Sequence, residues 1–97
     1  PELGNVSEQK KARTIIKKVW RGDYRVGITL AVCESGLREK VISNTHDVGY
    51  FQINPVHGFR DEEMLNGLSN AGYAYAIYKE QSLGPWEASR ECWEGRI

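Results

Sequence analysis

The chain has 97 residues, of which 40% are hydrophobic and 27% charged, and its 13 basic and 13 acidic side chains give no net charge. This length suits a single domain over residues 1–97 and leaves no room for a second core. The composition excludes a disordered chain, and no apolar run is long enough to span a bilayer.

The zero net charge conceals an uneven distribution, because acids prevail from Asp61 onward. The start of the chain is instead basic, with Lys10, Lys11, Arg13, Lys17, Lys18, Arg21 and Arg25. Such a run is most often a solvated helix face, although it also suits attraction to an anionic cell wall or to nucleic acid. The polar first residues lack the features of a secretory signal, so we expect a mature protein or a module of a longer one.

The first predicted helix runs from about Glu8 to Arg21. Ser7 is a suitable N-cap, apolar residues recur at helical spacing, and Gly22 ends the pattern. The second predicted helix, about Tyr24 to Ser35, is apolar nearly all round and is therefore expected to be the buried central one. Gly27 inside it weakens a helix by about 1 kcal/mol relative to Ala, which indicates close approach of another backbone.

Helical period is lost between Val41 and Asn54, where residues 43–47 have the composition of a turn. The segment after this turn alternates in the manner of a short strand, so we expect a small, irregular hairpin. Asp61–Leu65 is predicted to be a short helix, because its first turn is acidic and suits the helix dipole.

The last part of the chain predicts two more helices. Gly67 interrupts the helical pattern, and Ser69 is a suitable cap for a fourth helix reaching to about Gln81. Pro85 fits the first turn of a fifth helix. The predicted fold class is therefore α+β but mostly α, with about five helices around one small hairpin.

Glu34 lies at the end of an apolar run, in the last turn of the second predicted helix. There a carboxylate faces the negative end of the helix dipole, and apolar neighbours exclude water from it. Both effects favour the protonated form, which is how a carboxyl group becomes a general acid near neutral pH. The alternative is a structural Glu whose head reaches solvent past Cys33.

Asp47 supplies a second carboxylate, immediately before the alternating segment. Glycoside hydrolysis needs two carboxylates on opposite walls of a cleft, one to protonate the leaving oxygen and one to stabilise or attack the cationic sugar. The structural alternative for Asp47 is an Asx-turn residue that holds the hairpin.

Glu34 belongs to the first of three short sequence blocks that follow one another along the chain. They are Glu34-Ser35-Gly36, then Gly49-Tyr50-Phe51-Gln52-Ile53-Asn54, then Asn70-Ala71 with Ala74, Ile77, Tyr78 and Gly84-Pro85-Trp86. In this order and spacing they resemble the lysozyme-like superfamily, particularly its soluble lytic transglycosylase and goose-type domains. The resemblance extends from Ala31 to Trp86 and implies a lysozyme-like fold, which the predicted element count independently supports.

The resemblance also implies a cofactor-free enzyme that cleaves the β-1,4 bond between N-acetylmuramic acid and N-acetylglucosamine in peptidoglycan. Glu34 would be the general acid. Asp47 matches the second carboxylate of animal lysozymes, whereas in the transglycosylase branch that position is often not a carboxylate and the substrate's own hydroxyl closes an anhydro ring. Hydrolysis and anhydro-ring formation both stay open. A chitin-cleaving enzyme, an inactive glycan-binding module and a basic nucleic-acid binder are the remaining alternatives.

The predicted strand carries candidates for substrate binding. The amides of Gln52 and Asn54 would face the cleft together, because alternate strand residues share a face. Tyr50 and Phe51 would lie on opposite faces, so that one packs inward and the other offers its ring to a sugar.

Three candidates lie outside the strand. Tyr78 resembles the family's cleft tyrosine, and Asn70 resembles a residue that contacts substrate or braces the active-site loop. Ser35 follows Glu34 directly and is suited to orienting it. The structural alternatives are a core position for Tyr78 and local backbone capping for Asn70 and Ser35.

Cys33 and Cys92 fit either a single disulfide bridge in an oxidising compartment or two unbonded apolar side chains. Together with His46 and His57 they lack the paired spacing of a zinc site, so no metal site is expected. We expect peptidoglycan glycan strands as the partner, with neither nucleic acid nor a membrane span, and an extracellular, periplasmic, cell-wall-directed or phage-associated location. The oligomeric state is not indicated.

Overall fold

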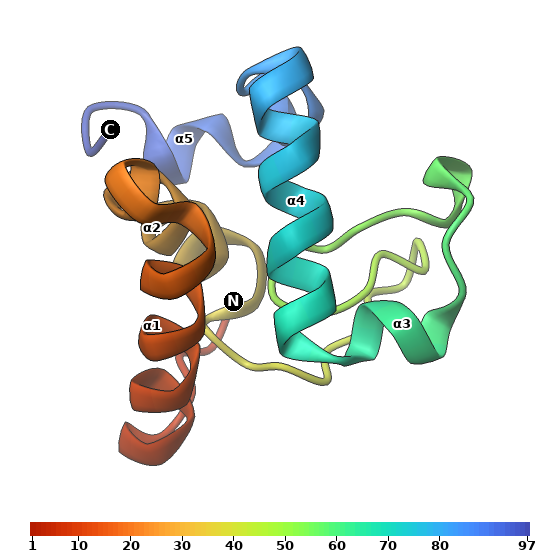
Figure 1. Cartoon of the computed structure of the whole chain (residues 1–97), viewed down its shortest axis with the longest axis horizontal. Helices are drawn as coiled ribbons and strands as arrows, with labels where there is room; N and C mark the ends of the chain where they lie inside the picture. Colours follow the sequence, from red (N-terminus) through yellow and green to blue (C-terminus); the bar gives the residue numbers. More distant parts are fainter.

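The computed structural model describes all residues 1–97 and shows an all-α protein (Figure 1). Its long helices are α1 (Val6–Trp20), α2 (Tyr24–Ser35) and α4 (Gly67–Gln81). The short ones are α3 (Asp61–Leu65) and the single turn α5 (Arg90–Trp93). Short 3₁₀ segments lie at Arg21–Asp23, Pro55–His57 and Gly84–Ser89. α1 packs against both α2 and α4, and α3 packs against α4.

The first four predicted helices are present, but two of them have other caps than expected. In place of the predicted fifth helix there is a 3₁₀ segment, Gly84–Ser89, that is kinked at Trp86, followed by the single turn of α5. α1 is capped by Asn5 and not by Ser7, because the Asn5 side chain accepts from Glu8 N at 2.8 Å and the Glu8 carboxylate accepts from Asn5 N at 2.8 Å. This reciprocal pair satisfies two backbone donors at once. α4 begins three residues earlier than a Ser69 cap requires, because Asn66 is the cap and its side chain accepts from Ser69 N.

The expected hairpin is not a sheet, so the α+β prediction is wrong and the fold class is all-α. Only two isolated bridges form, from Val48 to Ile42 and from Val48 to Ile53. A ladder cannot extend from them because Gly49 and Gln52 both have positive φ, 79° and 51°, which folds the chain back instead of extending it. The segment 41–54 is therefore a compact loop.

Trp20, at the end of α1, is the centre of the core. Its fully buried ring stacks on Phe51, with centroids 5.1 Å apart, and is also contacted by Tyr75 and Tyr78. Gly27 makes this arrangement fit, because a Cβ there would lie 2.6 Å from the Trp20 ring. The close approach expected at Gly27 thus comes from a side chain of α1 and not from another backbone.

A disulfide joins Cys33 at the end of α2 to Cys92 in α5, so the bonded alternative for the two cysteines is the one found. The extended start of the chain is held at the same end of α2, where Gly4 N donates to Gly36 O at 2.7 Å. None of the helices has both the length and the apolarity needed to cross a membrane.

Candidate active site

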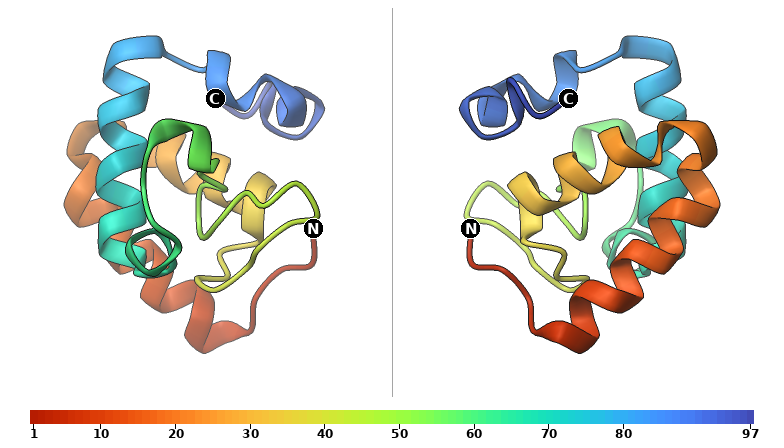
Figure 2. Two further views of the ribbon diagram at one scale, coloured as in Figure 1. Left: turned by 90° about the vertical axis from the view of Figure 1, so that its right-hand side faces the viewer. Right: turned by 90° about the vertical axis from the view of Figure 1, so that its left-hand side faces the viewer.

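Glu34 lies in the last turn of α2, which ends at Gly36 in the left-handed conformation. The end of α2 lies against the segment that leads into α5, with the 41–58 loop on another side (Figure 2). Glu34 is half-buried there and lines a cavity of about 130 Å³. The other lining residues are Asp47, Gln52, Ile53, Asn54, His57, Ile77, Pro85, Trp86 and Ala88.

The surroundings of Glu34 raise the pKa of its carboxyl group above the ordinary value. Burial is the main cause, because it removes water from the charged form. The nearby Ser89 hydroxyl, which donates to Trp86 O at 3.1 Å, opposes the shift, and the negative charge of Asp47 reinforces it. The expected general acid therefore has a carboxyl group biased towards its protonated form.

Asp47 lies in the same cavity, held by the loop that precedes it. Thr45 Oγ1 donates to its Oδ2 at 2.6 Å, and Asn54 Nδ2 donates to its Oδ1 at 2.7 Å. The Ser43 hydroxyl donates more weakly to Oδ2, at 3.3 Å, and accepts from Asp47 N. These bonds fix the position of the carboxylate, as a catalytic role requires. They also hold the turn, so the catalytic role and the structural alternative both fit Asp47.

Gln52 and Asn54 both line the cavity, although no strand positions them. Gln52 Nε2 donates to Val41 O and Gly49 O, at 3.2 and 3.0 Å, which leaves its amide oxygen unengaged. Asn54 is more fully used, because its oxygen accepts from Val56 N while its amide nitrogen holds Asp47. Asn54 thus orients the second carboxylate, and Gln52 retains an acceptor for a ligand.

Asn70 and Ser35 lie outside this cavity and are fully buried. Asn70 accepts from Phe51 N and donates to Val48 O and Met64 O, all between 2.8 and 2.9 Å. It therefore braces the loop that carries Asp47 and Gln52. Ser35 donates to Ala31 O at 3.0 Å, which is the local backbone capping named as its alternative.

Tyr50 and Tyr78 also lie outside the Glu34 cavity. Tyr50 and Phe51 are both buried, at 1% and 0% exposure, so the expectation that one of them offers its ring to a sugar is wrong. The turn between Gly49 and Gln52 directs both rings inward, because there is no strand pleat to alternate them. Tyr78 packs on Trp20 and borders a separate hollow at the end of α4.

Sequence reasoning assigned no role in the site to His57, Ile77 or Ser89. Trp86 forms one wall of the Glu34 cavity and is fixed there because its Nε1 donates to Phe51 O at 3.0 Å. The turn motif Gly84-Pro85-Trp86 was the one signal in the sequence for this wall. His57 ends a 3₁₀ turn after Pro55 and carries no recognisable motif. The sequence alone could therefore not show that His57 lines the cavity, because only the fold brings it there.

Two larger hollows, of about 360 and 450 Å³, lie elsewhere on the protein. Size alone would favour them, because the largest pocket is the usual first candidate for a binding site. Only the Glu34 cavity combines two carboxylates with a raised pKa on one of them. We therefore select it on its chemistry.

No family model, no curated protein and no solved structure matches the chain. No group of three or more His, Cys, Asp or Glu side chains is arranged to hold a metal ion.

Proposed function

We propose that the protein cleaves the β-1,4 bond between N-acetylmuramic acid and N-acetylglucosamine in peptidoglycan, with Glu34 as general acid. The observation that carries this proposal is the pairing, in one cavity, of Asp47 with a glutamate of raised pKa. Paired carboxylates in unlike environments divide acid and stabilising roles between them. The proposed family is the lysozyme-like superfamily, supported by the three sequence blocks.

In the proposed reaction the Glu34 carboxyl donates its proton to the glycosidic oxygen as the bond to the anomeric carbon breaks. The leaving sugar departs with that proton as an alcohol. Asp47, held by Thr45 and Asn54, is positioned to stabilise or attack the cationic sugar. Water then adds to the anomeric carbon and returns a proton to the Glu34 carboxylate.

The second candidate outcome is non-hydrolytic, with the substrate's own hydroxyl taking the place of water and closing a 1,6-anhydro ring. The three side chains that donate to Asp47 favour it, because they occupy lone pairs that a nucleophile would use. In this version Glu34 acts first as acid and then as base. A role outside the cytoplasm suits both versions, since the disulfide weakly favours an oxidising compartment.

The two outcomes are separated by the Asp47→Asn variant together with mass spectrometry of the fragments released from purified peptidoglycan. A hydrolase should give ordinary reducing ends and lose most of its activity in this variant. A transglycosylase should give products lighter by one water and keep most of its rate. Glycan binding without any released fragment would instead indicate an inactive module and contradict both versions.

A further inference from the structure

The solvent-exposed face of α1 carries only positive charge beyond its first turn. Figure 1 shows α1 along one edge of the molecule, and the buried residues of the helix, Ala12, Ile16 and Trp20, belong to the core. From Lys10 onward every exposed side chain of the helix except Thr14 is basic. These side chains, which we call the basic face, are Lys10, Lys11, Arg13, Lys17 and Lys18. None of them lines the Glu34 cavity.

The acidic side chains on either side of the basic face are bound elsewhere. Glu8 precedes the face and closes the capping box with Asn5, so its carboxylate lies at the helix N-terminus. Asp23 follows the face and accepts from the Tyr75 hydroxyl at 2.8 Å, with Lys79 Nζ 3.9 Å away. The fold thus gives both acids partners outside the basic face and leaves its charge largely uncompensated.

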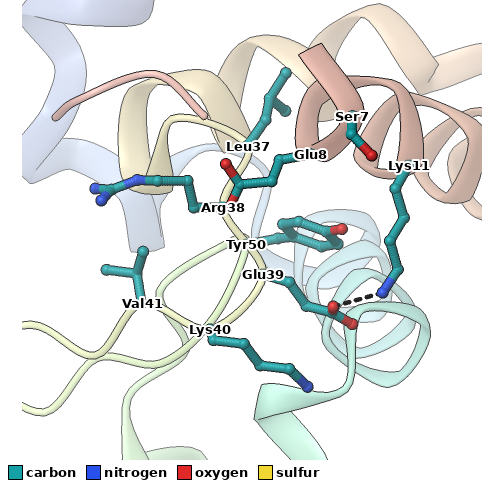
Figure 3. Close-up of a pocket in the computed structure, with 9 residues that line it drawn as sticks. All are labelled: Ser7, Glu8, Lys11, Leu37, Arg38, Glu39, Lys40, Val41 and Tyr50. Atoms are coloured by element: carbon teal, nitrogen blue, oxygen red, sulfur yellow. Dashed lines mark hydrogen bonds and ion pairs between the residues drawn. The ribbon is translucent and has the colours of Figure 1, made fainter. Parts of the chain in front are cut away.

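Lys11 is the one member of the basic face with an ion-pair partner. Its Nζ lies 2.7 Å from Glu39 Oε1, in the hollow of about 360 Å³ beside Tyr50 (Figure 3). The other four members form no ion pair in the protein. Among them Lys10, Arg13 and Lys17 are spaced three and four residues apart, so they lie along one side of the helix over about 10 Å. Like charges at this spacing repel each other, and bound anions relieve the repulsion.

The positive charge continues from Lys17 onto the start of α2. Lys17 Nζ lies 5.6 Å from the centre of the Tyr24 ring, and Arg25 Cζ lies 5.9 Å from the same centre. Arg25 Nε donates to the Tyr24 hydroxyl at 3.4 Å, which leaves the two terminal nitrogens of the guanidinium unengaged. The hydrogen bond and charge of Arg25, and then the charge of Lys17, lower the pKa of Tyr24. This end of the basic face therefore offers free donors in a positive environment.

The surroundings of the basic face limit the kind of partner that fits it. A membrane surface requires an apolar stripe beside the basic one, and the only large apolar side chain exposed on α1 is Val6, before the face begins. Single-stranded nucleic acid requires open aromatic rings on which bases stack, and the Tyr24 ring is occupied by Lys17 and Arg25. What remains is a partner recognised by its repeated anionic groups alone.

We propose that the basic face, together with Arg25, binds the anionic groups of the cell wall and holds the protein on its insoluble substrate. The choice of a wall as the partner rests on the proposed function, whereas the positive surface does not. Two wall components present this chemistry, the carboxylates of the peptides in peptidoglycan and the phosphate groups of polymers attached to it. The Glu34 cavity cleaves the glycan, and the basic face supplies a separate contact with the same wall.

Sedimentation with purified cell walls tests this proposal. Every protein in the assay carries Glu34→Gln, so that the walls stay intact, and the apparent Kd is measured at about 0.1 M and about 1 M salt. Over this range the screening length falls from about 10 Å to about 3 Å, so the Kd should rise at least about tenfold. Walls stripped of their phosphate polymers identify the source, because binding to them persists if carboxylates are recognised and is lost if phosphates are.

Paired substitutions locate the binding. Lys10→Gln with Lys17→Gln removes two charges from the basic face and should weaken binding at least about tenfold, since each cation near an anionic surface contributes about fivefold. Lys40→Gln with Arg96→Gln is the matched control, because it removes the same charge from exposed positions outside the face and should leave the affinity unchanged. Equal weakening in both double variants would show that only net charge matters and would overturn the proposal.

Three other results also overturn the proposal: no binding to walls, binding that salt does not weaken, and tighter binding to duplex DNA at an equal concentration of anionic groups. Fragment release from the same walls by the protein with Glu34 intact is measured separately. Salt-dependent binding through the basic face without any release rejects the proposed function and leaves the wall contact supported. Release without such binding rejects the wall contact alone.

Discussion

Glu34 and Glu39 are near neighbours in the sequence, and the protein shifts their pKa values in opposite directions. Burial by itself raises the pKa of each carboxyl group. At Glu34 burial prevails, because it is opposed mainly by one hydroxyl, that of Ser89. At Glu39 hydrogen bonds from Lys11 and Gly67 outweigh burial, so its pKa lies below the ordinary value.

The geometry at Glu39 explains the difference. Lys11 Nζ in α1 lies 2.7 Å from Glu39 Oε1, and Gly67 N at the start of α4 donates to Oε2 at 2.7 Å. A charged donor and a helix N-terminus both stabilise a carboxylate. Glu39 therefore joins two helices as an anion, whereas Glu34 has little to hold its charge. Glu34 is also the more deeply buried of the two, so its depth and its lack of donors together suit it to deliver a proton.

The largest expected effect is on activity in the Glu34→Gln variant. Gln keeps the size of the side chain and its hydrogen bonding but has no proton to transfer, so the rate of peptidoglycan cleavage should fall at least about 10²-fold. Release of soluble fragments from purified cell walls measures this rate. Glu62→Gln, at an exposed position in α3, is the matched control and should cleave as the parent does. Cleavage by Glu34→Gln at the parent rate would remove the basis of the proposed function.

The next largest effect concerns the disulfide, which joins α2, the helix of Glu34, to α5, directly after the segment Gly84–Ser89 that carries Trp86 and Ser89. Replacing both Cys33 and Cys92 with Ser should lower the free energy of unfolding by about 2–5 kcal/mol. The wall should also loosen, so that water reaches Glu34 and its pKa moves towards the ordinary value, while the partners of Glu39 stay in place.

Urea unfolding measures the stability loss, and the parent in reductant provides an independent comparison. Carbon-13 NMR titration of the two glutamates measures the selective shift. Equal displacement of both pKa values would show that the bond supports the whole fold and not the Glu34 wall in particular.

Glu39→Gln tests the other half of the comparison. Gln keeps one acceptor oxygen for two donors, Lys11 Nζ and Gly67 N, so one hydrogen bond is lost and the other no longer has an anionic acceptor; the change should cost about 1–3 kcal/mol of unfolding free energy at neutral pH. Because the folded-state pKa of Glu39 is lowered, its contribution is present above the ordinary glutamate pKa and is lost as the pH falls through the folded value. The parent and the variant should therefore converge in acid. A difference that stays constant across the pH range would mean that the ion pair with Lys11 contributes nothing.

The sequence predicted the local part of this comparison. The bounds of α2 and the place of Glu34 in its last turn follow from an apolar run that ends at Gly36, and both are confirmed. The role of Glu39 could not be predicted, because its partners Lys11 and Gly67 lie 28 residues away in either direction. Only the fold brings these residues together.

The conformation of the loop between Val41 and Asn54 could not be predicted from the sequence either. Its alternation of side chains is typical of a strand, but positive φ at Gln52 cannot be recognised from the sequence of a non-glycine residue. The burial of Tyr50 follows from that turn. Asp47 and Glu34 still share a cavity, because Asn70 braces the loop from α4.

The smallest expected effect is a gain in stability in Glu34→Gln. A raised folded-state pKa means that the native protein binds the Glu34 proton more tightly than the unfolded chain does. Stability is then highest below the ordinary glutamate pKa and falls as the pH rises through the folded value. Gln carries no such penalty, so the variant should unfold at higher urea concentration than the parent at neutral pH, and the two should coincide in acid. Glu39→Gln has the opposite sign at neutral pH, which makes the pair a direct test. If Glu34→Gln were instead destabilised at neutral pH, the carboxylate of Glu34 would be held by donors as Glu39 is, and its assignment as the proton donor would fail.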